Sequence, residues 1–509
     1  MTTTHIALDG ETLSLQRIKS AQTISISSAS REKMLASRRV VDQLTQSSKA
    51  HYGINTGFGV LAREKIAPKD LEKLQENLIL SHAVGVGDLV PEGIVRWMLL
   101  LKANALAKGY SGISLEAVEM LCEFFNRRIL PVIYTQGSVG ASGDLAPLAH
   151  LVLAMMGEGE VLLNGKQIPA RKALTQCGLS PYKLKSKEGL ALINGTQFML
   201  AYAVEALLRA EVMTKTADVC AAITLEAMRG SSSPFDARIH ALRPHQGQIA
   251  VAKNILRLIE GSEIMQSHKD CQKVQDPYSL RCAPQVHGAC RDAIDYARRV
   301  VEIELNSATD NPLVFENGDV ISGGNFHGEP LALALDMLAI ALAELASISE
   351  RRIYLLLGGD SVGGIDLPKL LMRDTGLNSG FMLPQYTAAA LVSENKILAH
   401  PASVDSIPTS LGQEDHVSMG SISATKLYKV VQNVETVLAI ELMCAAQALD
   451  FLRPMKSGKG VEAAHKEIRS VVPHAESDRL FHNDIEAVLR LVQSEAILQV
   501  VSKAVGDLE

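Results

Sequence analysis

Ala141, Ser142 and Gly143 form a tripeptide in which a serine stands between two residues with minimal side chains. If the chain bends sharply there, which Gly143 allows best, the nitrogen of Gly143 can attack the carbonyl carbon of Ala141 and close a five-membered ring. Loss of water from that ring and from Ser142 would leave a methylidene group, which is a strong electrophile. The tripeptide alone favours a simpler interpretation, because Ala-Ser-Gly is common: Ser142 or Asp144 would cap the helix that follows.

Glycine and polar residues interrupt the helical pattern in several loops, and the tripeptide lies in one of them. Polar loops held between rigid helices are where binding and catalytic sites are usually built. The loops are Tyr52–Gly59 (YGINTGFG), Ser81–Gly87 (SHAVGVG), Gly137–Asp144 (GSVGASGD), Ile193–Gln197 (INGTQ), Gln275–Cys282 (QDPYSLRC), Ser322–Pro330 (SGGNFHGEP) and Gln413–Met419 (QEDHVSM).

Long segments rich in Ala, Leu, Glu, Met and Lys must position these loops. Their apolar residues recur every three or four positions, which predicts helices. The predicted helices are Ile94–Lys108, Leu115–Arg127, Gln197–Met228, Cys290–Leu305, Pro330–Leu357, Met382–Leu398 and Ser421–Leu452. The segments 330–357 and 421–452 are apolar on more than one face, so they need neighbours on several sides and predict a central bundle with subunit contacts.

We therefore expect an all-α, mainly α, fold: a long central helical bundle with a loop-rich N-terminal domain and minor short strands. The clearest strand signal is VLLNGKQI at 161–168, which predicts a hairpin closed by Asn-Gly. The absence of βαβ alternation weighs against a nucleotide-binding sheet. The expected domain boundary lies near residue 200. Residues 1–200 would carry the tripeptide, and residues 201–509 would form the long-helix bundle and a C-terminal helical region.

Composition excludes several classes of function. The chain has 509 residues, 47% hydrophobic and 4% aromatic, and a net charge of −6, which gives no surface for nucleic acid or anionic membrane. Seven widely spaced cysteines without CxxC fit free thiols in a reducing compartment, and no secretory signal is visible. The apolar run 331–347 contains Asp336 and Glu344, so it predicts a buried helix rather than a membrane span. We expect a cytoplasmic protein.

No metal site is expected. His268, Cys271, Cys282, His287 and Cys290 lie within a short span, but they lack the paired spacing of metal ligands.

Taken together and in this order, the loops resemble those of the aromatic amino acid ammonia-lyase and aminomutase family, from YGINTGFG to Leu452-Arg453-Pro454. GSVGASGDLAPLAH resembles the family's cofactor signature, in which Ala-Ser-Gly becomes 4-methylideneimidazol-5-one. The resemblance implies a homotetramer with active sites built from loops of three subunits, and no metal or diffusible cofactor. It also implies helix N-termini directed at the electrophile. The chain departs from the pattern at 357–364, which carries no transferred residue.

The resemblance also implies roles for individual residues. Tyr52 would take the β-proton of the substrate, for which its phenol, with an ordinary pKa of about 10, needs a lowered pKa. Arg281 would pair with the substrate carboxylate, since the two groups match as a planar fork. Asn194 would hold that carboxylate or the cofactor oxygen. Tyr278 and Gln275 would be hydrogen-bond donors near the electrophile and the substrate.

Two positions bear on which amino acid is bound. At the position of His82, relatives acting on phenylalanine typically show an apolar pair, and at Glu414 the phenylalanine and tyrosine relatives usually carry glutamine. An imidazole can hydrogen-bond both groups, whereas a phenyl ring would leave them buried and unpaired. The sequence thus predicts elimination of ammonia from L-histidine to give trans-urocanate. Glu414 would also be catalytic, and Phe326 would pack close to the cofactor.

Three alternatives stay open at this point. The chain could be a tyrosine or phenylalanine ammonia-lyase, or an aminomutase that returns the amine to the β-carbon. It could be a helical scaffold without activity. Glu414 could form a structural salt bridge with an arginine, which would remove one argument for histidine.

Overall fold

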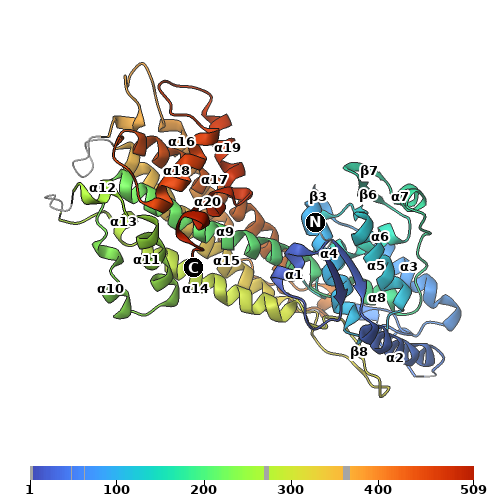
Figure 1. The fold of residues 1–509 in the computed structure, drawn as a ribbon. Coiled ribbons are helices and arrows are strands. Elements are labelled where there is room, and N and C mark those ends of the chain that lie inside the picture. Colours follow the sequence, from blue (N-terminus) through green and yellow to red (C-terminus); the bar gives the residue numbers. More distant parts are fainter. Residues whose placement is uncertain (1–3, 48, 62, 269–273, 359–366) are drawn as a thin grey trace. The chain divides into compact units, whose positions relative to one another are not determined.

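The computed structural model describes residues 4–47, 49–61, 63–268, 274–358 and 367–509. Helices dominate this part of the chain and the strands are short (Figure 1). The expected all-α class is therefore confirmed. Most of the segment 357–364, where the sequence departs from the family pattern, lies outside the described residues.

The chain divides into two compact units. The first contains Met1–Glu205, Ala297–Asp336 and Pro401–Thr425, and the second contains Ala206–Tyr296, Met337–His400 and Lys426–Glu509. The expected ranges 1–200 and 201–509 are continuous, whereas each unit is discontinuous in sequence, because four long helices contribute residues to both. Those helices are α9 (Gln197–Ala227), α14 (Ala283–Glu304), α15 (Glu329–Leu357) and α17 (Gly420–Asp450). The domain boundary near residue 200 stays a prediction.

The first unit contains the shorter helices of the N-terminal part of the chain. They are α1 (Leu15–Ser20), α2 (Ser28–Thr45), α3 (Leu71–His82), α4 (Glu92–Ala107), α5 (Leu115–Arg127), α6 (Leu145–Met155), α7 (Ala170–Gln176) and α8 (Glu188–Ile193). Helices α3, α6 and α8 pack against one another, and the inner face of α6 is fully buried through Leu148, Leu151 and Val152. This packing fixes where the loops at the ends of the three helices meet.

Short strands also belong to the first unit. They are β1 (His5–Leu8) parallel to β2 (Thr23–Ile26), β3 (Val86–Leu89) antiparallel to β5 (Tyr134–Gln136), β4 (Leu130–Pro131) antiparallel to β6 (Glu160–Leu163), β6 antiparallel to β7 (Lys166–Pro169), and β8 (Leu313–Val314) antiparallel to β9 (Val320–Ile321). Strands β6 and β7 confirm the predicted hairpin. Asn164 and Gly165 have φ of 52° and 72°, as a two-residue type I′ turn requires.

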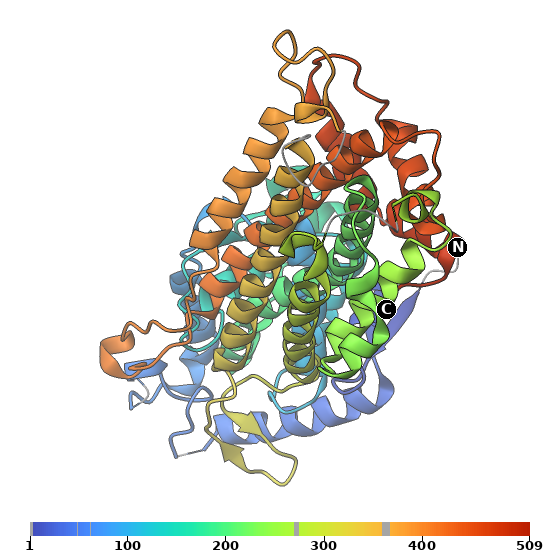
Figure 2. The same ribbon diagram turned by 90° about the vertical axis from the view of Figure 1, so that its left-hand side faces the viewer.

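The second unit contains most of the long helices. The shorter ones around them are α10 (Ala237–Ala241), α11 (Gln246–Leu258), α12 (Glu263–Gln266), α13 (Tyr278–Arg281), α16 (Met382–Leu398), α18 (Lys459–Val471), α19 (Phe481–Gln493) and α20 (Ala496–Val505). Within this unit α9, α14, α15 and α17 lie side by side in both views (Figures 1 and 2). The predicted long helices are confirmed, with ends that differ by a few residues; α14 begins seven residues earlier than expected, at Ala283.

A buried ion pair joins three helices of this bundle. Glu441 on α17 accepts two hydrogen bonds from Arg352 on α15, at 2.5 Å from Nε and 2.8 Å from Nη2, and neither side chain is exposed. Ser349 on α15 and Thr224 on α9 donate to the same carboxylate at 2.5 and 2.8 Å. Because loss of one partner would leave a buried charge unpaired, this network specifies how the helices pack.

Helix α15 is the only described helix that is long and apolar enough to cross a membrane. Of its most apolar window, 67% is buried inside the structure. A core helix of a folded protein has this composition and this burial, so the feature gives no support to a membrane span.

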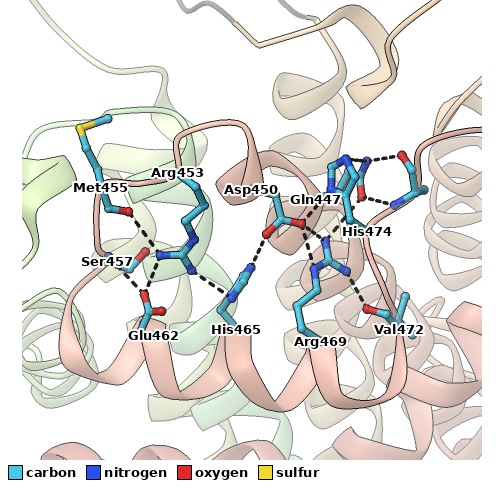
Figure 3. Close-up of polar contacts among 11 residues, drawn as sticks. Gln447, Asp450, Arg453, Met455, Ser457, Glu462, His465, Arg469, Val472 and His474 are labelled. Atoms are coloured by element: carbon cyan, nitrogen blue, oxygen red, sulfur yellow. Dashed lines mark hydrogen bonds and ion pairs between the residues drawn. The ribbon is translucent and has the colours of Figure 1, made fainter.

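A second polar network closes the C-terminal end of α17 against α18 (Figure 3). The carboxylate of Asp450 accepts hydrogen bonds from His465 at 2.7 Å, from His474 at 2.8 Å and from Arg469 at 3.0 Å. Burial alone would raise the pKa of Asp450. The hydrogen bond from His465, the Arg469 guanidinium and the bond from His474 outweigh burial and hold that pKa well below its ordinary value. The carboxylate is therefore more stable in the folded chain than in the unfolded one.

Replacing this carboxylate tests its contribution. We expect Asp450→Asn to lower the free energy of unfolding in urea at pH 7 by about 1–3 kcal/mol, the usual contribution of hydrogen bonds to a charged group. A carboxyl with a depressed folded pKa stabilises the fold above its unfolded pKa of about 3.9 and loses that contribution as pH falls toward the folded value. The gap between parent and variant should therefore narrow below about pH 4. The exposed Glu476, as Glu476→Gln, is the control, and an equal effect of both substitutions would contradict the account.

Candidate active site

Seven of the residues predicted for the site line one cavity in the first unit. The cavity has a volume of about 970 Å³ and is walled by α3, α8 and the loops near residues 57–61, 141–145, 322–327 and 410–416. The predicted residues among its walls are Tyr52, His82, Ala141, Ser142, Asn194, Phe326 and Glu414. Residues more than 360 positions apart in the sequence thus face the same space, as the sequence predicted.

The tripeptide lies where three helices begin. Helix α6 starts two residues after Gly143, and α9 starts two residues after Gly195, which faces Gly143 in an isolated parallel bridge. Helix α17 starts at Gly420, and the residues before it bond the same loop: Met419 N donates to Val139 O at 2.9 Å. Helix N-termini carry partial positive charge, so this arrangement favours negative charge at the tripeptide.

Gly143 and Gly195 approach so closely that neither tolerates a side chain. Gly143 has φ +77°, and a Cβ on it would lie 2.1 Å from the carbonyl oxygen of Gly195. Gly195 has φ +132°, and a Cβ there would lie 2.6 Å from both Gln197 Oε1 and Thr309 Oγ1. The amide of Asp144 completes the contact by donating to the Gly195 carbonyl at 2.7 Å. The bend expected at Gly143 is therefore present, and a second glycine holds it.

The polar atoms of Ser142 have defined partners. Its carbonyl oxygen accepts a hydrogen bond from Asn194 Nδ2 at 2.8 Å and one from the Gly195 amide at 3.4 Å. Its hydroxyl donates to Glu414 Oε1 at 2.9 Å. Two donors on one carbonyl form the kind of arrangement that stabilises negative charge on oxygen. Asn194 Oδ1 is buried without a hydrogen-bond partner among the described residues, so an acceptor remains available beside the tripeptide.

Asp144 caps a helix, but a different one from that suggested by the sequence. It is the residue before α6, yet its side chain makes no capping bond to that helix. Its Oδ2 accepts instead from the amides of Phe198 and Met199, both at 3.0 Å, in the first turn of α9. Oδ1 accepts from Ser421 at 2.8 Å. Complete burial raises the pKa of Asp144 to about 7, although these hydrogen bonds act to lower it.

Tyr52 lies in the cavity wall, but its surroundings do not lower its pKa. Burial raises the pKa of the phenol, and the carboxylates of Glu414 and Asp310 add to that effect. The amide of Gly59 donates to the phenol oxygen at 3.2 Å and works in the opposite direction. The surroundings of the phenol therefore raise its pKa where the proposed role needs a lowered one, because the hydrogen bond from Gly59 is outweighed by burial and the two carboxylates.

Glu414 is fixed by hydroxyl groups. Besides the bond from Ser142, its Oε2 accepts from Thr409 Oγ1 at 2.6 Å, and the backbones of the same two residues pair across a short turn. These partners replace the arginine salt bridge that the sequence left open. His82 ends α3 and bonds Ser81 through Nδ1 at 3.0 Å. Burial lowers the pKa of His82, so the neutral imidazole, a donor and an acceptor, is favoured.

Of the four predicted residues that do not line the cavity, Gly143 lies in the first unit, and Gln275, Tyr278 and Arg281 lie in the second. Gln275, Tyr278 and Arg281 contact one another: Arg281 Nη2 donates to Gln275 Oε1 at 3.2 Å, and its guanidinium lies 4.5 Å from the ring centre of Tyr278. Tyr278 is 70% exposed, and none of the three lines the cavity described above. They form a cationic and phenolic cluster of their own.

The histidines of the rejected metal alternative bond protein groups. His287 Nδ1 contacts Asp218 at 2.9 Å and its Nε2 accepts from Arg352 at 3.2 Å, while His268 contacts the carbonyls of Ile264 and Gly230. No group of three potential metal ligands occurs within the described residues. Cys271 lies outside them.

Some residues around the cavity were not singled out from the sequence. His327 and His416 both line it, and their rings stack with centres 6.0 Å apart and planes 6° apart. They come from two loops that were recognised, but no spacing in the sequence links them. Lys102 is fully buried behind the site. The signal that could have revealed it is a lysine within the apolar run MLLLKANALA of α4.

Comparison with known proteins places the chain in a family. The profile of the aromatic amino acid lyases matches residues 12–470. The chain belongs to the aromatic amino acid lyase family, which confirms the resemblance found in the loops. The histidine ammonia-lyase of Myxococcus xanthus (strain DK1622) is 51% identical to it over 509 residues, covering 99% of this chain and 100% of that protein.

Solved structures agree with this membership. The crystal structure of histidine ammonia-lyase from Trypanosoma cruzi matches with a TM-score of 0.91 at 45% identity, covering 98% of this chain and 96% of that one. The tyrosine aminomutase of Streptomyces globisporus matches with a TM-score of 0.93 at 36% identity, covering 99% and 100%. The fold is thus shared by members named for different reactions.

The glycine contact gives a testable prediction. Gly143 and Gly165 have nearly equal φ of +77° and +72°, but a Cβ on Gly165 meets nothing within 4 Å. Gly143→Ala and Gly165→Ala therefore share the backbone strain and differ in the clash alone. We expect Gly143→Ala to lower the free energy of unfolding by about 1–3 kcal/mol more than Gly165→Ala, a typical penalty of overpacking. Equal losses in urea unfolding would contradict the close approach.

Proposed function

We propose that this chain catalyses the non-oxidative elimination of ammonia from L-histidine, giving trans-urocanate, the first step of histidine degradation. A proton leaves the β-carbon, the bond between the α-carbon and nitrogen breaks, and a double bond forms between the two carbons. The observation that carries the proposal is that His82 and Glu414 line the same cavity as Ser142. The names of the relatives from M. xanthus and T. cruzi support it.

We further propose that Ala141, Ser142 and Gly143 form 4-methylideneimidazol-5-one. The residues present fit such a group, since Gly143 bends with φ +77° and the Ser142 carbonyl already has two donors. The group would supply an electrophilic carbon that bonds the substrate and eases the departure of either the β-proton or ammonia. Asn194 and the Gly195 amide would hold the oxygen that derives from the Ser142 carbonyl.

Tyr52 is the proposed base for the β-proton. Tyr52 lies in the wall of the same cavity as Ser142 and Glu414. Because burial raises its pKa in the empty cavity, we propose that the positive charge of the bound amino group lowers it when substrate is present. We assign a catalytic role to Glu414 as well, since its Oε1 accepts a hydrogen bond from the Ser142 hydroxyl, and Phe326, which lines the same cavity, would pack close to the group.

Recognition of the imidazole ring is assigned to His82 and Glu414. A neutral His82 and a carboxylate can together accept and donate hydrogen bonds to a substrate imidazole. A phenyl ring in the same place would offer these half-buried groups no hydrogen bond, and each hydrogen bond to the ring that is lost typically costs about 0.5–1.5 kcal/mol. The second candidate function, a tyrosine or phenylalanine ammonia-lyase or an aminomutase, is favoured by structural matches such as that to the S. globisporus enzyme.

The substrate carboxylate is assigned to Arg281, with Gln275 and Tyr278 beside it. These residues form an exposed cluster in the second unit, so we propose a homotetramer in which the cluster of one subunit completes the cavity of another. A cytoplasmic location is also proposed, and it is supported by six described cysteines that are all free thiols.

A substrate panel tests the activity. The purified protein should produce the absorbance of a conjugated product with L-histidine and little with L-tyrosine or L-phenylalanine. Ser142→Ala is the matched control, because it removes only the hydroxyl that the electrophile requires, and it should be inactive with all three. A preference for L-tyrosine or L-phenylalanine, or the release of a β-amino acid, would support the second candidate function instead.

The specificity argument is tested in the same assay. His82→Leu combined with Glu414→Gln should lower kcat/KM for L-histidine by about 10²-fold or more, since two hydrogen bonds to the ring are lost. The variant should retain the fold, because the amide oxygen of the introduced glutamine can still accept from Thr409. Unchanged turnover of L-histidine would refute the assignment of these two residues.

Shared sites predict complementation between inactive variants. Ser142→Ala damages the cavity and Arg281→Met damages the exposed cluster, so each should be inactive alone. If the two sets of residues come from different subunits, co-expression should restore activity in mixed oligomers. Activity that stays absent in mixed oligomers of confirmed composition would place both sets within one subunit.

A further inference from the structure

Lys102 is a buried charge that the proposed reaction does not use. It lies on α4 among apolar neighbours and is 1% exposed. Burial lowers the pKa of its ammonium group to about 7, and the carboxylates of Asp310 and Asp144 offset this only in part. A buried ammonium group destabilises the fold unless hydrogen bonds and ion pairs compensate for the loss of its hydration.

The partners of Lys102 lead directly to the tripeptide. Its Nζ donates to the backbone carbonyl of Asn194 at 2.6 Å and to Gln197 Oε1 at 3.4 Å. Asn194 ends α8 and Gln197 begins α9, so the lysine joins both ends of the turn that contains Gly195. A cation at the C-terminal end of α8 also meets the negative end of that helix dipole.

The same turn holds Ser142 from its other side. Asn194 Nδ2 and the Gly195 amide donate to the Ser142 carbonyl, at 2.8 and 3.4 Å. The Asn194 carbonyl and the Gly195 amide belong to one peptide unit. The Lys102 donor on that carbonyl polarises the peptide unit and strengthens its N–H as a donor, because hydrogen bonds in series reinforce one another.

We propose that Lys102 is a positioning residue for the Ala141–Gly143 tripeptide, acting through the Asn194–Gly195 peptide that holds the Ser142 carbonyl. The chain of contacts runs from Lys102 Nζ to the Asn194 carbonyl, and from the Gly195 amide to the Ser142 carbonyl. This inference rests on the proposed function, since it concerns the formation and the use of the proposed cyclised group.

A nearby lysine offers a matched control. Lys108 is on the same stretch of chain as Lys102, directly after α4, and its Nζ also donates to a backbone carbonyl, that of Gly10, at 3.3 Å. Gly10 has no part in the cavity. Lys108→Met therefore removes a lysine-to-carbonyl bond of the same kind without touching the turn at 194–197.

The test compares Lys102→Met, Lys102→Gln and Lys108→Met with the parent protein. The first readout is the mass of the protease-derived peptide containing residues 141–143, which should lack two water molecules in the parent and in Lys108→Met. In the Lys102 variants a substantial fraction of this peptide should retain them. The second readout is turnover of L-histidine by the cyclised fraction, where kcat should fall about 10- to 100-fold with little change in KM, since the loss is one of positioning.

Every outcome bears on the proposal. A folded Lys102→Met or Lys102→Gln protein with the parent's peptide mass and kcat overturns it. If neither variant folds while Lys108→Met does, the lysine serves folding of the whole unit and the positioning role is rejected. A parent peptide that retains both waters would reject the proposed cyclised group itself, which is a failure distinguishable from that of Lys102.

Discussion

The contact between the backbones of Gly143 and Gly195 is the constraint on which the site depends. Two chain segments can approach this closely only where both lack a Cβ, and each glycine adopts a positive φ that other residues rarely adopt. The contact brings the end of the tripeptide loop against the turn between α8 and α9. It sets the Asn194 side chain and the Gly195 amide on the Ser142 carbonyl, and it allows the Asp144 carboxylate to cap α9.

The tripeptide and the side chains assigned to the substrate ring lie on different structural elements around that contact. Rigid helix ends hold the backbone atoms of the tripeptide, where small displacements would change reactivity most. The groups assigned to the substrate ring stand on the end of α3 and on the turn at 409–414. Of the two side chains assigned to the substrate ring, Glu414 also accepts a hydrogen bond from Ser142, whereas His82 bonds Ser81. This separation is consistent with one fold serving relatives named for histidine and for tyrosine.

The sequence was sufficient for the fold class, the family and the long helices. The predicted bounds of α5 and α16 agree with the structure to the residue. The sequence did not predict α2, α3, α11, α18, α19 or α20, and it did not show that the loops near residues 310 and 410 belong to the first unit. Whether a distant segment folds back onto an earlier unit depends on tertiary contacts, and no pattern in the local sequence reports it.

Prediction of the candidate site was uneven for a physical reason. Motif residues that carry their own chemistry, such as Ser142 and Glu414, were found, and seven of them face one cavity. Properties that come from burial were not: Asp144 caps a helix more than fifty residues away, and the pKa of Tyr52 is raised rather than lowered because the phenol is buried near two carboxylates. Such properties depend on which groups surround a side chain in space, which spacing along the chain does not encode.

The most direct measurement is a crystal structure of the purified protein with an unreactive analogue of L-histidine bound. The account predicts electron density for a closed five-membered ring across residues 141–143, with its oxygen held by Asn194, and the imidazole of the analogue between His82 and Glu414. Three unmodified residues at 141–143, or an analogue whose ring lies away from both side chains, would contradict it.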